Sequence, residues 1–178
     1  MLGLGMTALP GLAQQTCPDP ESWQRENLDT AFERERRFAG MATPMRSHGR
    51  VQSEGDAIFW RTEAPIEMVL RIDADGISQS VAGGPMQPLA GTSQGSALAA
   101  GLIAPLLSGD LAGARADFAI EQRQDPTSGQ WHVTFEPKAA ALARVIERIE
   151  MTGCDRVEVV VIDQPNGDQD RVVFGEAG

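Results

Sequence analysis

The sequence predicts a mainly β fold with helices, of the α+β class, in a single domain. Hydrophobic residues make up 42% and charged residues 22% of the 178 residues, as in a globular chain that buries one core. Several short segments alternate apolar and polar residues, the period of a strand with one dry and one wet face. Gly, Pro, Asp and Asn separate these segments. An antiparallel sheet covered by a helix is therefore expected.

The first predicted elements are a short helix and a long strand. Asp19 or Ser22 can cap a helix that runs to about Leu28, with Trp23 on its buried side. The period then changes to two over residues 28–38. One face of this strand carries Leu28, Thr30, Phe32, Arg34, Arg36 and Phe38. Two arginines are thus expected beside two phenylalanines.

A meander of short strands follows. Strands are predicted over residues 50–52, 57–62, 66–73 and 77–81, each bounded by turn residues. The segment 66–73 has the clearest alternation, which predicts one dry face and one wet face. Its dry face would carry Ile66, Met68, Leu70 and Ile72.

The clearest helix covers residues 96–107. Its apolar residues recur near helical spacing, and Pro105 is expected to kink it. They are Leu98, Leu102, Ile103 and Leu106. This apolar arc is wide, which leaves two interpretations: the helix plugs the sheet as ordinary core, or it covers an apolar cavity in a sheet curled into an incomplete barrel.

The C-terminal half predicts two more hairpins. Strands 118–124 and 130–136 flank one turn, with Trp131, Val133 and Phe135 on one face. Strands 156–163 and 170–175 are joined through Asn166-Gly167, a strong hairpin signal. Between the hairpins, residues 139–151 fit both a helix and a strand, because their apolar spacing matches either period.

The charge of the chain excludes some partners. The net charge is −10 and the pI is about 4.6, and basic residues are interspersed with acidic ones. A phosphate backbone would be repelled, so nucleic acid is not an expected partner. The same charge disfavours anionic lipid headgroups, for which clustered Lys and Arg are needed.

The N-terminus indicates export. Residues 1–13 are apolar and end in small residues, as the end of a signal peptide does, so we interpret them as its remnant and residues 14–178 as the domain. Two cysteines, Cys17 and Cys154, are an even number in an exported chain. A disulfide between them is one of two open alternatives; two free thiols are the other.

Catalytic signals are weak. His48 and His132 are the only histidines, tyrosine is absent, and no metal or nucleotide motif is present. Residues 91–95 match the G-x-S-x-G pattern around Ser93, and Asp110 or Asp117 with His132 could complete a triad. Short hairpins precede Ser93, however, where this motif needs a buried parallel sheet. We expect no enzyme, no cofactor and no metal, and keep a serine esterase as a distant alternative.

Several motifs together resemble the LolA-like family of periplasmic lipoprotein carriers. They lie in family order over about residues 28–175, nearly the whole predicted domain. The N-terminal motifs are Phe32-x-x-x-Arg36, Pro44-Met45-x-Ser47-x-Gly49, Phe59-Trp60-x-Thr62-x-x-Pro65 and Asp75-Gly76. The C-terminal motifs are Trp131-x-Val133-x-Phe135-x-Pro137-Lys138, Ile149-x-Met151-x-Gly153, Val157 to Ile162, and Asn166-Gly167-Asp168 through Phe174.

This resemblance implies an unclosed antiparallel β-barrel with a helical lid, and a strand over residues 145–152. It implies a periplasmic carrier, expected to be a monomer, that takes the acyl chains of a lipoprotein or lipid into an apolar cavity and ferries it toward the outer membrane. An inner-membrane exporter and an outer-membrane receptor would be its partners. The expected cavity and lid residues are Phe32, Arg36, Phe38, Ile58, Trp60, Met68, Leu70, Leu98, Leu102, Ile103, Leu106, Trp131 and Val133.

One departure from the family pattern bears on the cargo. The family has an arginine and a proline just before the strand of Trp60, where they hold the lid shut. This chain has Glu54-Gly55-Asp56 there. Two alternatives for Arg36 therefore stand: it substitutes for that arginine and meets a polar headgroup, or it lies at the rim of the sheet. The cargo is open between a lipoprotein and another lipid, glycolipid or apolar metabolite.

Overall fold

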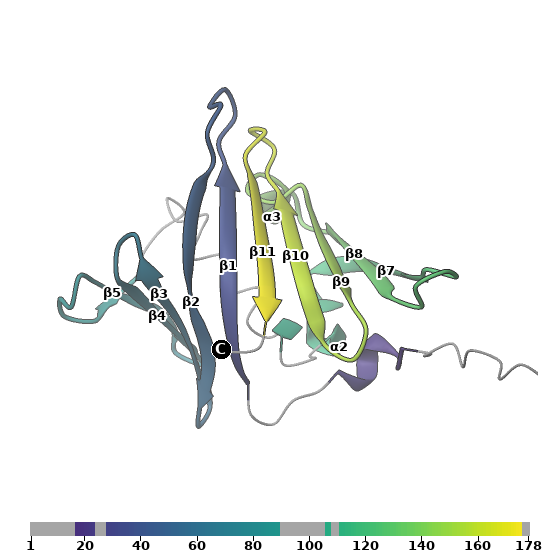
Figure 1. The fold of residues 1–178 in the computed structure, drawn as a ribbon, viewed down its shortest axis with the longest axis horizontal. Helices are drawn as coiled ribbons and strands as arrows, with labels where there is room; N and C mark the ends of the chain where they lie inside the picture. The colour runs from purple at the N-terminus through teal and green to yellow at the C-terminus, as the bar shows by residue number, and fades with distance from the viewer. Residues whose placement is uncertain (1–16, 24–27, 90–105, 108–110, 176–178) are drawn as a thin grey trace, which may run out of the picture.

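The chain folds around one antiparallel sheet of eleven strands, in the order β6-β5-β4-β3-β2-β1-β11-β10-β9-β8-β7. The computed structural model describes residues 17–23, 28–89, 106–107 and 111–175. The first strand, β1, lies in the middle of the sheet and pairs with the last, β11. Within the described residues, the outermost strands β6 and β7 are not paired with each other. The sheet curves strongly and remains unclosed (Figure 1), which confirms the predicted fold class.

The strands of the first half are β1 (Asp29–Arg37), β2 (Met45–Glu54), β3 (Ala57–Ala64), β4 (Met68–Asp73), β5 (Gly76–Val81) and β6 (Gln87–Pro88). Those of the second half are β7 (Phe118–Gln124), β8 (Trp131–Pro137), β9 (Arg148–Gly153), β10 (Val157–Asp163) and β11 (Gln169–Gly175). Short helical turns among the described residues are η1 (Pro20–Ser22), α2 (Leu111–Ala114) and α3 (Ala140–Ala143). No helix among the described residues is long and apolar enough to cross a membrane.

Alternation along each strand gives the sheet a dry face and a wet face, as the sequence predicts. The dry face, called the inner face below, belongs to one continuous core cluster. In the middle of the sheet it is built from Phe32, Val51, Trp60, Val160, Val172 and Phe174. The wet face, called the outer face below, carries charged residues such as Glu33 and Arg171. The core therefore lies on one side of a single sheet.

Several predicted boundaries need correction. β2 begins at Met45, five residues before the predicted strand. The sequence did not predict this first part of β2 because its residues Arg46 and His48 are polar. Ile66 was placed on the dry face, but β4 begins only at Met68, and Ile66 is 62% exposed in the β3–β4 connection. The connection between β10 and β11 spans residues 164–168, because the last pair is Asp163 with Gln169. This connection contains Asn166-Gly167, as predicted, and β11 begins one residue earlier than predicted.

The ambiguous stretch 139–151 contains both elements. Ala140–Ala143 forms the helical turn α3, where alanine favours helix. β9 then begins at Arg148 and places Ile149 and Met151 on the inner face. The strand implied by the family resemblance is confirmed, but it starts three residues later than residue 145. Of the predicted N-terminal helix, the structure shows the turn η1, which Asp19 caps by accepting from the amide of Glu21; Trp23 and Leu28 are not helical, and residues 24–27 lie outside the described residues.

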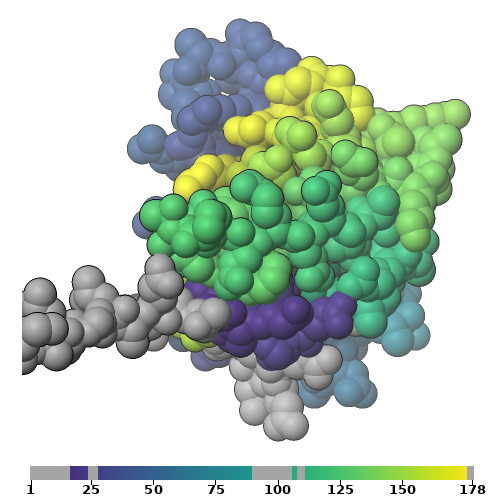
Figure 2. All heavy atoms as spheres, turned by 90° about the vertical axis from the view of Figure 1, so that its right-hand side faces the viewer, coloured from purple at the N-terminus to yellow at the C-terminus, as the bar shows by residue number. Residues whose placement is uncertain are grey.

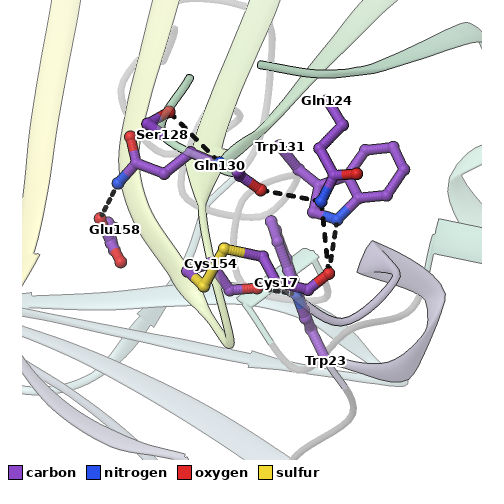
Figure 3. The surroundings of a disulfide bond; sticks show 9 residues. Cys17, Trp23, Gln124, Ser128, Gln130, Trp131, Cys154 and Glu158 are labelled. Atoms are coloured by element: carbon purple, nitrogen blue, oxygen red, sulfur yellow. Dashed lines mark hydrogen bonds between the residues drawn. A yellow bond between two sulfur atoms is a disulfide. The ribbon is translucent and has the colours of Figure 1, made fainter. Parts of the chain in front are cut away.

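A disulfide fixes the N-terminal segment to the connection between β9 and β10. Cys17 and Cys154, 137 positions apart in sequence, are bonded in the structure, which is one of the two alternatives that the sequence left open. The indole Nε1 of Trp23 donates to the carbonyl oxygen of Cys154 at 2.7 Å (Figure 3). The carbonyl oxygen of Cys17 accepts from Gln124 Nε2 and Trp131 Nε1, both at 3.4 Å. The segment around η1 consequently lies against the hairpin of β7 and β8 (Figure 2).

Loss of this disulfide should weaken the fold. The double variant Cys17→Ser, Cys154→Ser is expected to lower the free energy of unfolding by about 2–4 kcal/mol, because a bond that closes so long a loop restricts the unfolded chain. Urea unfolding of both proteins measures the difference. Reductant should reproduce the loss in the wild type and leave the double variant unchanged. An equal unfolding midpoint for wild type and variant would contradict this role.

Candidate functional site

The centre of the inner face is a cluster of aromatic rings. Phe32 of β1 lies opposite Phe174 of β11 and opposite Gly49 of β2. The rings of Phe32 and Trp60 are 4.7 Å apart, and Trp60 meets Phe174 edge to face at 6.1 Å. Such tilted and edge-to-face contacts are the favourable geometries of aromatic pairs. All three side chains are nearly fully buried.

Gly49 allows the backbones of β2 and β3 to approach each other closely. A methyl group at Gly49 would lie 1.9 Å from the carbonyl oxygen of Arg61 and 2.9 Å from Cα of Thr62. The pairing of β2 with β3 shifts register between His48 and Gly49, as at a β-bulge. Only a residue without a side chain fits where the two backbones approach so closely. The glycine of the Pro44-Met45-x-Ser47-x-Gly49 motif thus has a structural reason.

Most of the predicted cavity residues lie on this inner face. Trp60 pairs with Leu70, Thr62 with Met68, and Ile58 with Ile72, so β3 and β4 extend the apolar surface away from β1. Val133 is buried in the same cluster on the other half of the sheet, and Trp131 packs against it. Leu106 is buried there too, beside Leu107 and Leu111. Leu98, Leu102 and Ile103 lie outside the described residues.

A network of ion pairs borders the apolar face at one end of the strands, where β1 ends and β11 begins. Arg34 lies on the same face as Phe32, and its Nη2 is 2.6 Å from Oδ1 of the buried Asp170. Arg36 lies between two carboxylates, 3.6 Å from Asp168 and 3.9 Å from Asp170. Its guanidinium also stacks on the ring of Phe38, 4.6 Å from the ring centre. Arg36 points to the inner face as predicted, and it forms ion pairs with acidic residues of the protein itself.

Asp168 links two loops at this end of the strands. Its Oδ1 accepts from the backbone amide of Ala39 at 2.9 Å, which connects the β10–β11 loop to the β1–β2 hairpin. This hydrogen bond, together with Asn166 and the guanidinium of Arg36, lowers the pKa of the Asp168 carboxyl. The carboxylate is therefore ionised at neutral pH, and it stays paired with Arg36.

The outer face carries hollows of a different character. One of about 620 Å³ lies over β11, β1 and β2 and is lined by charged side chains, including Glu33, Arg46 and Arg171. A second, of about 180 Å³, lies over β7, β8 and β9 beside Glu121 and His132. Neither is an apolar pocket. Among the described residues, no group of three or more His, Cys, Asp or Glu side chains could hold a metal ion.

The geometry separates Asp117 from His132, one of the two carboxylate–histidine pairs that the esterase alternative offers. Phe118 pairs with Pro137 and Arg123 pairs with His132, so the start of β7 and His132 are five strand positions apart. At about 3.3 Å per residue, Asp117 lies roughly 16 Å or more from His132 along the strands, far beyond hydrogen-bond reach. His132 also points to the outer face. Ser93 and Asp110 lie outside the described residues.

Sequence reasoning missed part of the site. Phe174 completes the aromatic cluster and Asp170 holds both arginines, yet neither was predicted as a site residue. Alternation over residues 170–174 does put Asp170, Val172 and Phe174 on one face. A strand with a buried aspartate beside two valines and a phenylalanine is unusual, because a buried carboxylate needs a cationic partner. That pattern was the available signal.

The fold and the site define a class: a β-protein in which one unclosed, curved sheet presents a continuous apolar face, bordered at one end of the strands by ion pairs. No protein-family model matches the chain, and no curated protein matches it.

Two solved structures are similar to it in fold. One is a LolA superfamily protein from Nitrosomonas europaea, with a TM-score of 0.48 and 9% identity over 88% of both chains. The other is a DUF1329 family protein from Desulfovibrio piger, with a TM-score of 0.44 and 9% identity over 84% of this chain and 85% of that one.

Proposed function

We propose that this chain is a periplasmic carrier that binds the acyl chains of a lipoprotein or lipid against its inner face and ferries them toward the outer membrane. The observation that carries the proposal is the shape of the sheet: the eleven-stranded sheet has one apolar face, and its outermost described strands, β6 and β7, do not pair with each other. An unclosed apolar face of this length suits a long, flexible hydrocarbon chain. The motifs shared with the LolA-like family support the same function.

The proposal describes a binding protein without catalysis. The apolar inner face offers few groups that exchange protons near neutral pH, and His132 lies on the opposite face. An exporter in the inner membrane and a receptor in the outer membrane would hand over and accept the cargo. The chain would work as a monomer, since each copy has its own apolar face.

A second candidate keeps the fold and changes the cargo. Gly55 and Asp56 form an exposed turn between β2 and β3, where the lipoprotein carriers have their arginine and proline. Arg36, which could have substituted for that arginine, forms ion pairs with Asp168 and Asp170 instead. These two observations favour a LolA-like binder of a non-lipoprotein lipid, glycolipid or apolar metabolite.

Binding of a fluorescent fatty-acid probe tests the inner face directly. Met68 and Val69 are neighbours on β4, both half-buried, and they point to opposite faces of the sheet. Met68→Gln is expected to weaken probe affinity about tenfold, because it places an amide among apolar side chains. Val69→Gln changes the outer face only and should stay within about twofold of the wild type. Equal losses in both variants, or none in Met68→Gln, would refute binding at the inner face.

A further inference from the structure

Exposed apolar side chains gather at one end of the strands of the sheet. Within the described residues, five large hydrophobic side chains are exposed: Met41, Met45, Ile66, Val81 and Met86. Successive strands are antiparallel, so the β1–β2, β3–β4 and β5–β6 connections all lie at the same end of the strands. All five side chains belong to these connections or to the strand ends beside them. Scattered exposed hydrophobics need no explanation, but a set confined to one end of the strands does.

The β1–β2 connection is the most pronounced part of this end of the sheet. Residues 38–45 contain no charged side chain, and they include Phe38, Met41 and Met45. Met41 is 59% exposed and Met45 is 54% exposed. This hairpin projects farther than the neighbouring β10–β11 loop, at the top of the view in Figure 1. The structure thus holds uncharged, apolar side chains out into solvent on a protruding tip.

Arginines stand just behind the apolar tip on both strands. Arg37 ends β1 and Arg46 follows Met45 in β2, with 64% and 80% of their side chains exposed. They share a single carboxylate, Glu35, so the three groups together carry a positive charge. Arg171 of β11 lies opposite Glu35 as well. From Arg36 to Ser53 the sequence has four arginines and no acidic residue, although the whole chain has a net charge of −10.

The connections at the opposite ends of the strands carry acidic residues. The connections there follow β2, β4, β7 and β9, and each contains an aspartate. These residues are Asp56, Asp75, Asp125 and Asp155. The β1–β2 hairpin therefore carries a net positive charge and the connections at the opposite ends of the strands carry aspartates, while Asp168, which pairs with Arg36, lies beside the hairpin. A negatively charged surface would turn such a molecule so that the tip faces it.

We propose that the β1–β2 hairpin docks the protein on a lipid bilayer that contains anionic headgroups. Met41, Met45 and Phe38 would enter the boundary between headgroups and acyl chains. Arg37 and Arg46, one step behind on either strand, would then lie at the depth of the lipid phosphates. This layering of an apolar tip and a cationic collar is that of an interfacial anchor. The proposal goes beyond cargo binding and does not depend on it.

A bilayer fits the hairpin better than a protein partner does. The hairpin protrudes (Figure 1), and the side chains of Met41 and Met45 are unbranched and flexible, so they can adapt to a fluid interface. Its apolar residues lie in the loop and its cations lie on both strands behind, so the chemistry changes with depth rather than across a flat patch. The net negative charge of the chain opposes binding in general, and the net positive charge of the hairpin confines contact to it.

Flotation with lipid vesicles tests the proposal. The full chain is mixed with phosphatidylcholine vesicles with or without phosphatidylglycerol, at low and at high salt. We expect binding to the anionic vesicles only, reduced by salt. Arg37→Gln with Arg46→Gln should weaken binding about 25-fold, at about fivefold for each arginine. Met41→Ser with Met45→Ser should weaken it by about tenfold.

A matched variant serves as the control. Arg71→Gln with Arg123→Gln removes two exposed arginines from other strands. This variant should bind as the wild type does. All variants share the same N-terminus, so any contribution of residues 1–13 cancels. Failure of the wild type to bind anionic vesicles, or equal binding by the hairpin variants and the wild type, would overturn the proposal.

Discussion

Replacing Asp170 with alanine is expected to lower the free energy of unfolding by about 3 kcal/mol or more. Asp170 is 1% exposed and lies 2.6 Å from the guanidinium of Arg34, with Arg36 at 3.9 Å. Its removal leaves two arginines on the inner face with one carboxylate fewer, and an uncompensated charge away from water is costly. Urea unfolding followed by tryptophan fluorescence measures the loss, since Trp60 lies in the same core cluster.

Asp29 provides the control for this change. It also forms an ion pair across strands, with Arg50 at 2.6 Å, but the two side chains are 51% and 34% exposed. Such exposed pairs contribute about 0.2–1 kcal/mol. Asp29→Ala should therefore cost far less than Asp170→Ala. Similar losses in the two variants would mean that the buried network does not hold β1 to β11.

Gly49→Ala is the second change with a large expected effect, a loss of about 3 kcal/mol. Its methyl group would meet backbone atoms of Arg61 and Thr62 rather than a flexible side chain, so β2 and β3 would have to move apart. Overpacking of this kind lies at the costly end of its usual range. The movement would also disturb Phe32, which lies opposite Gly49. We expect a lower unfolding midpoint together with weaker binding of the fatty-acid probe.

Gly175→Ala is the matched glycine variant. Gly175 also lies in a strand of the same sheet, but no heavy atom lies within 4 Å of a methyl group placed there. Alanine also restricts the unfolded chain slightly more than glycine, so stability should be unchanged or slightly higher. If Gly49→Ala were as stable as Gly175→Ala, the close approach of β2 and β3 would not require a glycine.

The sequence predicted the elements whose signals are local. β7 has the predicted bounds, residues 118–124, because its alternation is regular and turn residues bound the hairpin. Leu70 and Val133 were each assigned to one face of a strand by the same alternation, and both are buried. Period and turn chemistry act over a few residues, so a single sequence reveals them.

The remainder of the site depends on contacts between distant parts of the chain. Arg34 meets Asp170 because β1 pairs with β11, and no local pattern predicts which of the strands will be neighbours. The same pairing brings Phe174 to Trp60. Ile66 was misplaced because alternation continues beyond the true start of β4, in a segment that begins with Pro65, a residue without a backbone donor.

Native mass spectrometry of the protein recovered from its native cells tests the central claim most directly. The account predicts a population heavier than the polypeptide by the mass of an acylated molecule, lost when Met68 is changed to Gln and retained when Val69 is. An acylated peptide as the released species would identify lipoprotein cargo, and a free lipid or glycolipid would identify the second candidate. A spectrum with the mass of the polypeptide alone, under conditions that preserve a known carrier with its lipid, would contradict the account.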